Sequence, residues 1–213
     1  MIELMLGDCL EMMRSIPDNS VDLCVTSPPY FNAKEYSQYK TIKEYLDEMK
    51  NVFSLIYKKT KLSRMCVINI SPVIVAREKR SDQSKRIPLP FYIVPTMESI
   101  GFEFLEDIIW EKPDGAAINR NGGFYRHRKP VAYKPNIVTE YILVFKKSAP
   151  FLIDKVVMGY NSVESLVNED YERTNIWKIN PETKSDHPAP FPIKIPLNII
   201  RYYSYINDIV LDP

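Results

Sequence analysis

The hydrophobic and polar positions along the chain change period in a way that predicts alternating strands and helices. Apolar runs lie at residues 2–6 and 21–26, and residues 9–16 between them carry apolar side chains at helical spacing. The second run is mostly apolar, as in strands buried on both faces of a parallel sheet. This order predicts a βαβ unit, whose right-handed crossover places the helix on one face of the sheet.

The alternation continues through the middle of the chain. Gly101 is expected to end one predicted helix, and Pro95 is expected near the first turn of the same helix. A polar segment at residues 77–86 has no period, and we expect it to be mobile. Helices are predicted at residues 41–58 and 90–101, and strands at residues 65–71, 103–112 and 139–147.

Beyond Lys147 the pattern weakens until the last part of the sequence. Residues 191–206 then predict a helix entered through prolines, and residues 208–213 predict one more buried strand. Strands and helices in this order predict an α/β fold of three layers.

Composition narrows the class of protein. The chain has 213 residues, of which 45% are hydrophobic and 26% charged, as in an ordinary globular protein with a substantial core. Its formal net charge of +1 gives no global sign of a nucleic-acid partner, so such a partner must be argued from local patches. Cys9, Cys24 and Cys66 have no metal-ligand spacing and suit a reducing compartment. Without a signal region or a membrane-length apolar run, we expect a cytoplasmic protein with no membrane contact and no metal.

The tetrapeptide Ser27-Pro28-Pro29-Tyr30 follows the apolar run at 21–26. Ligands of open α/β sheets bind outside the carboxyl ends of the strands. Two successive prolines make a stiff exit whose carbonyls can still accept hydrogen bonds, and Pro28 holds Ser27 extended. A hydroxyl, a fixed carbonyl and an aromatic ring in one place suit a planar group that carries an amino function. Alone, the motif is more often a turn with a core tyrosine, but its position after a buried strand favours a site.

Three blocks of the sequence, residues 6–30, 139–147 and 186–213, resemble the amino-group DNA methyltransferases, which methylate cytosine N4 or adenine N6. More narrowly, they resemble the permuted beta group, in which the catalytic motif precedes the cofactor motif. The resemblance implies a Rossmann-like S-adenosylmethionine-dependent methyltransferase fold with a mixed sheet of the seven-strand type, here incomplete. It also implies a catalytic part at residues 1–147, a small target-recognition region at 148–186 and the start of the cofactor-binding part at 187–213.

The family's catalytic tetrapeptide is Asp, Asn or Ser, then Pro-Pro, then an aromatic residue, and Ser27, Pro28, Pro29 and Tyr30 match it. The resemblance implies that Ser27 and the Pro28 carbonyl accept hydrogen bonds from the amino group of a flipped base, on which Tyr30 stacks. Serine at the first position favours cytosine N4 over adenine N6, and both remain open.

The resemblance also implies a binding site for S-adenosylmethionine. Asp8 is expected to contact the cofactor adenine, although it would serve equally as a helix cap. The family's cofactor motif continues into a glycine-rich turn that this sequence does not contain, so we expect an incomplete enzyme. That expectation covers a fragment, half of a split enzyme whose second chain supplies the turn, or, less favoured, a homodimer. The remaining cofactor candidates are His187, Pro188, Phe191, Asp212 and Pro213.

Between Lys112 and Lys147, eight basic residues stand against two acidic ones and are interleaved with aromatic residues. This pattern suits phosphate contacts and base stacking on double-stranded DNA, although it would also suit a solvated hairpin tip. A different class, a non-catalytic DNA-binding or partner subunit that lost the cofactor turn, remains open. A protein-glutamine or RNA substrate is disfavoured by Ser27 and by the order of the blocks. The candidate DNA-binding residues are Arg120, Phe124, Tyr125, Arg126, Arg128, Lys129, Tyr133 and Lys134.

Overall fold

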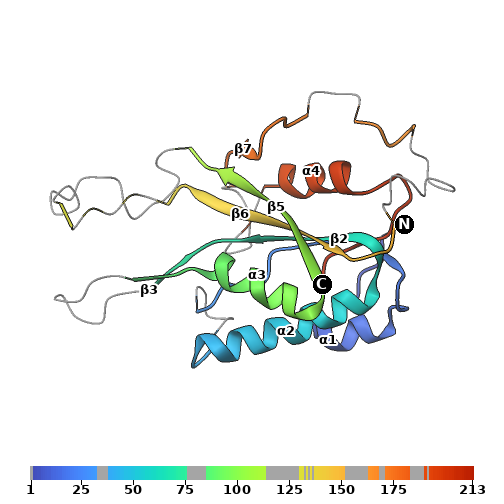
Figure 1. The fold of residues 1–213 in the computed structure, drawn as a ribbon, viewed down its shortest axis with the longest axis horizontal. Helices are drawn as coiled ribbons and strands as arrows, with labels where there is room; N and C mark the ends of the chain where they lie inside the picture. The colour runs from blue at the N-terminus through green and yellow to red at the C-terminus, as the bar shows by residue number, and fades with distance from the viewer. Residues whose placement is uncertain are drawn as a thin grey trace.

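The structure is a computed structural model, shown as a ribbon in Figure 1. It consists of helices packed on both faces of one mixed sheet, with a small two-stranded ladder beside it. The structure describes residues 2–32, 38–75, 85–113, 130, 131, 133, 135, 137–151, 163–167, 171–182, 190 and 192–213. In these parts the helices are α1 (Cys9–Met12), the 3-10 helix η1 (Met13–Ser15), α2 (Ile42–Lys59), α3 (Leu89–Ile100) and α4 (Lys194–Tyr203). The strands are β1 (Val21–Thr26), β2 (Thr60–Ile70), β3 (Val73–Val75), β4 (Lys85–Ile87), β5 (Phe102–Glu111), β6 (Thr139–Lys147), β7 (Ile176–Lys178) and β8 (Val210–Leu211).

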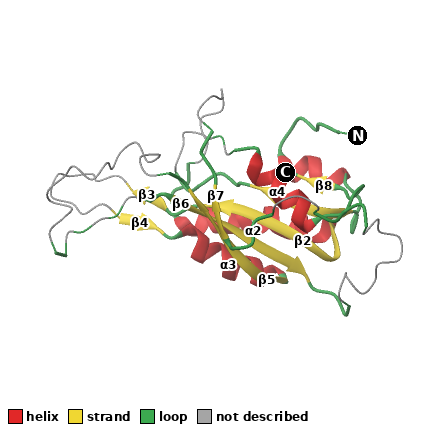
Figure 2. Ribbon diagram, turned by 90° about the horizontal axis from the view of Figure 1, so that it is seen from above, coloured by secondary structure: helices red, strands yellow, loops and turns green. Residues whose placement is uncertain are grey.

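The six strands of the main sheet lie in the order β7-β5-β6-β2-β1-β8. Strand β1 runs parallel to β2 and to β8, whereas β6 runs antiparallel to both β2 and β5. Strands β3 and β4 form a separate antiparallel ladder, seen beyond the main sheet in Figure 2. Because α2 connects the parallel strands β1 and β2, these three elements form a βαβ unit.

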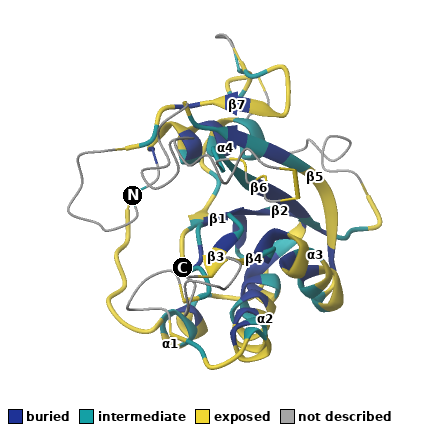
Figure 3. Ribbon diagram, turned by 90° about the vertical axis from the view of Figure 1, so that its left-hand side faces the viewer, coloured by how far each residue is buried: buried dark blue, intermediate teal, exposed yellow. Residues whose placement is uncertain are grey.

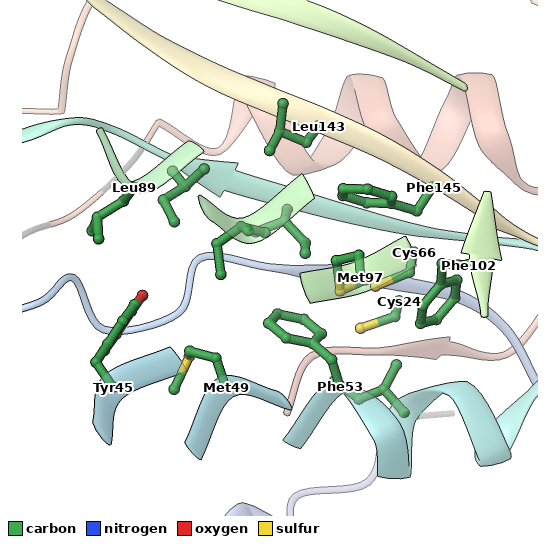
Figure 4. Packing of buried hydrophobic residues seen from close by; sticks show 14 of the residues in the cluster. Cys24, Tyr45, Met49, Phe53, Cys66, Leu89, Met97, Phe102, Leu143 and Phe145 are labelled. Carbon is green, nitrogen blue, oxygen red and sulfur yellow. The ribbon is translucent and has the colours of Figure 1, made fainter. Parts of the chain in front are cut away.

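Alternate side chains of the strands enter two separate cores, which makes the fold three layers. Cys24, Cys66 and Phe145 point to the face covered by α2 and α3, and they pack there with side chains such as Phe53 and Met97 (Figure 4). The neighbouring strand residues pack on α4 at the opposite face; among them are Leu23, Val25, Val67, Ile142 and Val144. All six residues of β1 are buried, as predicted for a strand with both faces covered (Figure 3).

Local chemistry accounts for the ends of the two long helices. The Thr41 hydroxyl accepts a hydrogen bond from the Glu44 amide at 3.1 Å and caps the start of α2. Helix α3 ends at Gly101, whose φ of 119° lies in the left-handed region that glycine adopts without strain. Pro90 occupies the first turn of α3, so the prediction that Pro95 lies near that turn is wrong. Pro95 lies inside the helix, where it donates no backbone hydrogen bond.

The predicted strand at residues 2–6 is also wrong, and so is the βαβ unit that was predicted from it with residues 9–16 and 21–26. These residues belong to no strand of the sheet, and Ile2, Leu4 and Leu6 are exposed. An apolar run becomes a strand only where a neighbouring strand satisfies its backbone groups, and the described part of the chain offers this segment no such neighbour.

The other predicted helices and strands are found close to their predicted positions. The last strand, predicted as buried at 208–213, is an exception, because β8 contains only Val210 and Leu211, of which the first is exposed and the second half-buried at the edge of the sheet. Strand β7 lies in the region where the pattern was weak, and it pairs with β5. The predicted mobile segment at 77–86 falls mostly outside the described residues. Among the described helices, none combines the length and the apolar composition that a membrane crossing needs.

Candidate active site

The tetrapeptide Ser27-Pro28-Pro29-Tyr30 begins where β1 ends, at the carboxyl edge of the parallel strands. Pro28 is buried, Ser27 and Tyr30 are half-buried, and Pro29 is exposed. Thr26 lies opposite Ile68 in the β1–β2 register, which brings Ser27 next to Asn69 near the end of β2. The predicted position of the motif at a strand end is therefore confirmed.

A hydrogen-bond network joins the tetrapeptide to β2 and β6. The Tyr30 hydroxyl donates to Oε2 of Glu140 at 2.9 Å, across 110 residues of sequence. Nδ2 of Asn69 lies 2.9 Å from the same carboxylate oxygen, 3.1 Å from the Tyr30 hydroxyl and 3.5 Å from Oγ of Ser27. Because Glu140 lies at the start of the antiparallel strand β6, it meets the carboxyl ends of β1 and β2 at one edge of the sheet.

Lys112, just beyond β5, completes this network. Its ammonium group donates to Oε1 of Glu140 at 2.5 Å and lies 4.3 Å from the centre of the Trp110 ring. Trp110 is itself fixed, because its indole nitrogen donates to the Ile179 carbonyl at 2.8 Å. Both oxygens of the Glu140 carboxylate are thereby engaged by donors.

The surroundings of Tyr30 raise its pKa well above the ordinary value. Burial is the main cause, and the negative charge of Glu140 is the second. The Ser27 side chain lowers the pKa of Tyr30 and so opposes part of this shift. The phenol therefore stays neutral and retains the proton that it donates to Glu140.

Sequence reasoning did not identify Asn69, Lys112 or Glu140 as site residues. Two of them left a signal, because each is a polar residue in an otherwise mostly apolar predicted strand: Asn69 in "MCVINIS" and Glu140 in "TEYILVFKK". A polar residue that must be buried needs a partner, but the pattern of a single strand does not identify that partner.

Asp212 lies at the same edge, on the other side of β1. The register pairs Cys24 with Leu211, so Asp212 follows β8 beside the end of β1. Surrounding protein raises the pKa of the Asp212 carboxyl by desolvation, and a hydrogen bond with the Thr26 side chain opposes this shift. Asp212 and Ser27 therefore lie at one edge of the sheet, and Pro213 is exposed beside them.

Asp8 caps α1. Its Oδ1 accepts hydrogen bonds from the Leu10 and Glu11 amides at 2.9 and 3.3 Å. The helix-cap interpretation is therefore confirmed, and the contact with the cofactor adenine stays a prediction. Asp8 is exposed, and each of its carboxylate oxygens can accept more than one hydrogen bond.

Most predicted DNA-binding residues and part of the predicted cofactor block lie outside the described residues. Tyr133 is described, and 70% of its surface is exposed. The residues outside the described parts are Arg120, Phe124, Tyr125, Arg126, Arg128, Lys129, Lys134, His187, Pro188 and Phe191.

Comparison with known proteins gives a consistent picture. Residues 21–213 match the family model of the N6 and N4 methyltransferases, described as DNA methylase. The chain is 32% identical over 221 residues to the Type II beta methyltransferase M.BslI of Bacillus sp. (strain NEB-606). That alignment covers 100% of this chain and 24% of M.BslI, so the chain spans about a quarter of this relative's length.

Solved structures share the fold. The structure of TTHA0409 from Thermus thermophilus, complexed with S-adenosyl-L-methionine, superposes with a TM-score of 0.70 at 28% identity and covers 98% of this chain and 76% of that one. The PvuII DNA methyltransferase, which is cytosine-N4-specific, superposes with a TM-score of 0.69 at 21% identity, over 97% of this chain and 72% of that one. The three-layer arrangement of one mixed sheet between helices is therefore the Rossmann-like fold of S-adenosylmethionine-dependent methyltransferases. This chain belongs to the DNA methylase family of N6 and N4 methyltransferases.

Proposed function

We propose that this chain carries the methyl-transfer site of a Type II DNA methyltransferase, which modifies the exocyclic amino group of a base in double-stranded DNA. The observation that carries the proposal is the position of Ser27-Pro28-Pro29-Tyr30 at the carboxyl edge of β1, between Asp212 on one side and Asn69 and Glu140 on the other. Acceptors and an aromatic ring meet there on a rigid support.

The chemistry follows from the weakness of the nucleophile. The lone pair of an exocyclic amino nitrogen is delocalised into the ring, so the nitrogen attacks poorly while it stays planar. Ser27 Oγ and the Pro28 carbonyl accept its N–H groups and stabilise the positive charge that develops on it. Removing one such preorganised hydrogen bond costs about 3–4 kcal/mol of barrier in other enzymes. Holding the nitrogen in line with the methyl group lowers the barrier further through proximity.

The methyl donor is S-adenosylmethionine, which supplies a methyl group activated by a sulfonium centre. Asp212 is suited to bind this cofactor. Its carboxyl group lies at the edge of the sheet beside Ser27, where it can accept hydrogen bonds from a positively charged ligand. Asp8, His187, Pro188, Phe191 and Pro213 are the other residues that we assign to this cofactor.

Tyr30 holds the flipped base by stacking. The base cannot be reached inside a duplex, so it leaves the helix and enters the site. Hydrogen bonds from the Tyr30 hydroxyl to Glu140 and from Asn69 to that hydroxyl fix the orientation of the ring. Because its hydroxyl group is held by these hydrogen bonds, the Tyr30 ring keeps a fixed orientation in which one face can stack on the base.

Cytosine N4 is the favoured target, with adenine N6 as the alternative, and the choice rests on serine at the first tetrapeptide position. DNA is bound by the basic and aromatic residues predicted between Arg120 and Lys134. The reaction would protect DNA within a restriction-modification system. A second protein chain or a second copy in the active species stays a prediction, which sedimentation with and without DNA would test.

Methylation of a mixed-sequence duplex DNA with labelled S-adenosylmethionine tests the proposal directly. Digestion of the product to nucleosides should yield N4-methyl-2′-deoxycytidine, or N6-methyl-2′-deoxyadenosine if the alternative holds. Ser27→Ala should lower turnover by about 100-fold or more, with little change in cofactor affinity, because the hydrogen bond that it removes acts in the transition state.

Ser20→Ala is the matched control, because among the described residues the Ser20 hydroxyl bonds to a local backbone group, the Pro17 carbonyl, at 2.7 Å. Equal losses of turnover and cofactor affinity in Ser27→Ala would contradict the role given to Ser27. DNA binding without any methyl transfer would instead support a non-catalytic subunit.

A further inference from the structure

The side chain of Asn32 joins the chain that leaves the tetrapeptide to Tyr39. Nδ2 of Asn32 donates to the Tyr39 carbonyl at 2.9 Å, and the Tyr39 amide donates to Oδ1 of Asn32 at 2.6 Å. One side-chain amide therefore binds both backbone groups of Tyr39, as a neighbouring strand would. Asn32 has a φ of 48°, in the left-handed region that asparagine adopts more readily than most residues. An asparagine at this position thus serves both the turn of the backbone and the side-chain contact.

This contact places the Tyr39 ring on Phe31, the residue that follows Tyr30. The two rings are stacked, with centroids 6.2 Å apart and planes inclined by 20°. Both rings also pack edge-on against the Tyr45 ring, at 5.9 Å from Phe31 and 5.2 Å from Tyr39 between centroids. Tyr45 projects from α2 and is fully buried in the core (Figure 4). The Asn32 contact therefore attaches the chain after the tetrapeptide to the core at α2.

Hydrogen bonds to α2 hold the other side of this contact. The Tyr39 hydroxyl donates to Oε1 of Glu48 at 3.1 Å, and burial together with this hydrogen bond raises the pKa of Tyr39 to about 12. The Lys40 amide donates to Oε2 of Glu44, in the first turn of α2, at 3.0 Å. Tyr39 is thus a fixed point, and the Asn32 amide is anchored to it.

Tyr30 is consequently held at two points. Its hydroxyl is bound by Glu140 and Asn69 at one end of the side chain. At the other end, its backbone continues directly into Phe31 and Asn32. A ring that is held only at its hydroxyl can still tilt when the backbone behind it moves. The contact between Asn32 and Tyr39 prevents that movement.

We propose that Asn32 is a positioning residue of the methyl-transfer site, which fixes the backbone behind Tyr30 so that the ring receives the base in one place. The inference rests on the proposed function, because it assumes that the base stacks on Tyr30. Asn32 touches neither the base nor the cofactor and acts through Phe31 and Tyr30. A misplacement of about 1 Å at a reacting centre can cost about 100-fold in rate, so a contact outside the tetrapeptide can control turnover.

Two substitutions at Asn32 separate the side-chain contact from the turn. Asn32→Asp keeps the size of the side chain and an acceptor for the Tyr39 amide, but an ionised carboxylate has no donor for the Tyr39 carbonyl. Asn32→Gly removes both hydrogen bonds and still allows the left-handed backbone. Asn51→Asp is the matched control, because it makes the same chemical change at an exposed position of α2.

The fluorescence of 2-aminopurine in a short single-stranded oligonucleotide tests the inference without a known target sequence and without the cofactor. The fluorescence change at saturation reports how the base is held, whereas the midpoint of the titration reports the affinity. Both Asn32 variants should reduce the change at saturation by about twofold or more, because the base no longer stacks on a fixed ring. The midpoint should stay within about threefold of that for Asn51→Asp, because the basic residues that bind phosphates are unaltered. Tyr30→Ala should abolish the change.

The methylation assay gives a second readout. At saturating DNA, Asn32→Asp and Asn32→Gly should lower turnover by roughly tenfold, because the ring that places the base is displaced. The affinity for S-adenosylmethionine should stay equal to that of Asn51→Asp, because Asn32 does not contact the cofactor in this proposal. A purely structural role would instead lower cofactor affinity and turnover together, as the folded fraction falls.

The same fluorescence change at saturation in Asn32→Asp and Asn51→Asp would overturn the inference. A wild-type change that survives in Tyr30→Ala would overturn it as well, because the base would then not be held by that ring. Methylation by the wild type separates this failure from failure of the proposed function. A protein that methylates DNA without dependence on Asn32 loses the inference alone, and one that shows neither loses both. A protein whose fluorescence change depends on Asn32 but that does not methylate keeps the positioning role and loses the assignment as an enzyme.

Discussion

Asp212 illustrates how a single residue at the sheet edge depends on its neighbours. The strand pattern places this carboxylate at the end of β8, but its protonation behaviour comes from the surrounding protein and from Thr26. Its pKa is raised above the ordinary value of 3.8, so the unfolded chain loses the proton first as the pH rises. Stability that is fully present below pH 3.8 is therefore lost as the pH rises through the folded pKa.

Asp212→Asn should remove this dependence. Relative to the wild type, the variant should gain stability as the pH rises from below 4 to neutral, because asparagine carries no charge for the surrounding protein to desolvate. Urea unfolding at several pH values measures the difference. Asp47→Asn, on the exposed surface of α2, is the control. A difference between Asp212→Asn and the wild type that stays constant with pH would contradict the raised pKa.

At the scale of the element, β8 is too short to hold itself in the sheet. Only Val210 and Leu211 pair with β1. Just before the strand, Asp208 makes two hydrogen bonds of 2.9 Å with the Arg64 guanidinium, which lies 3.0 Å from Asp22. All three side chains are buried, so this ion cluster attaches β8 to β1 and β2.

Arg64→Met should therefore destabilise the fold and release β8. It would leave two buried carboxylates, Asp22 and Asp208, facing each other without the guanidinium. Breaking a buried ion pair by removing one partner costs about 3–5 kcal/mol. Urea unfolding gives this loss, and faster hydrogen exchange of the Ile209 amide, which donates to Asp22 at 3.0 Å, reports the release of β8.

Lys43→Met is the matched control for Arg64→Met. The exposed pair of Lys43 with Asp47 on α2 contributes only about 0.5 kcal/mol or less. A loss for Arg64→Met no larger than that of the control would show that the cluster does not hold β8.

At the scale of the whole molecule, a net charge of +1 provides almost no overall electrostatic attraction for DNA. Binding must then depend on the local excess of basic residues between Lys112 and Lys147. Each phosphate that a basic side chain neutralises releases counterions, so a few such residues determine the salt dependence of the affinity.

Alanine at Arg126, Arg128 and Lys129 should reduce the salt dependence of DNA binding. The slope of log affinity against log salt should fall in magnitude by about 0.9 for each phosphate that is no longer neutralised. Alanine at the exposed residues Lys43, Lys50 and Lys58 of α2 removes the same charge and should leave the slope unchanged. Equal slopes in the two triple variants would assign DNA binding to another surface.

The sequence by itself determined what depends on short-range patterns. The continuous apolar run at residues 21–26 predicts a buried strand, and β1 lies there with both faces covered. The helical spacing of apolar residues at 41–58 predicts a helix, and α2 lies there with one face buried. The prolines of the tetrapeptide likewise predict a rigid strand end, since their geometry is covalent. The same reasoning fails at residues 2–6, because a strand also needs a neighbour that the pattern cannot supply.

The tertiary structure alone decided the composition of the candidate site. Tyr30 meets Glu140 across 110 residues, and Asn69 meets Glu140 across 71, only because β6 runs antiparallel beside β2 and begins where β1 and β2 end. Strand order and direction are set by the packing of the whole sheet. The hydrogen-bond partners of Tyr30, Asn69 and Glu140 follow from that packing.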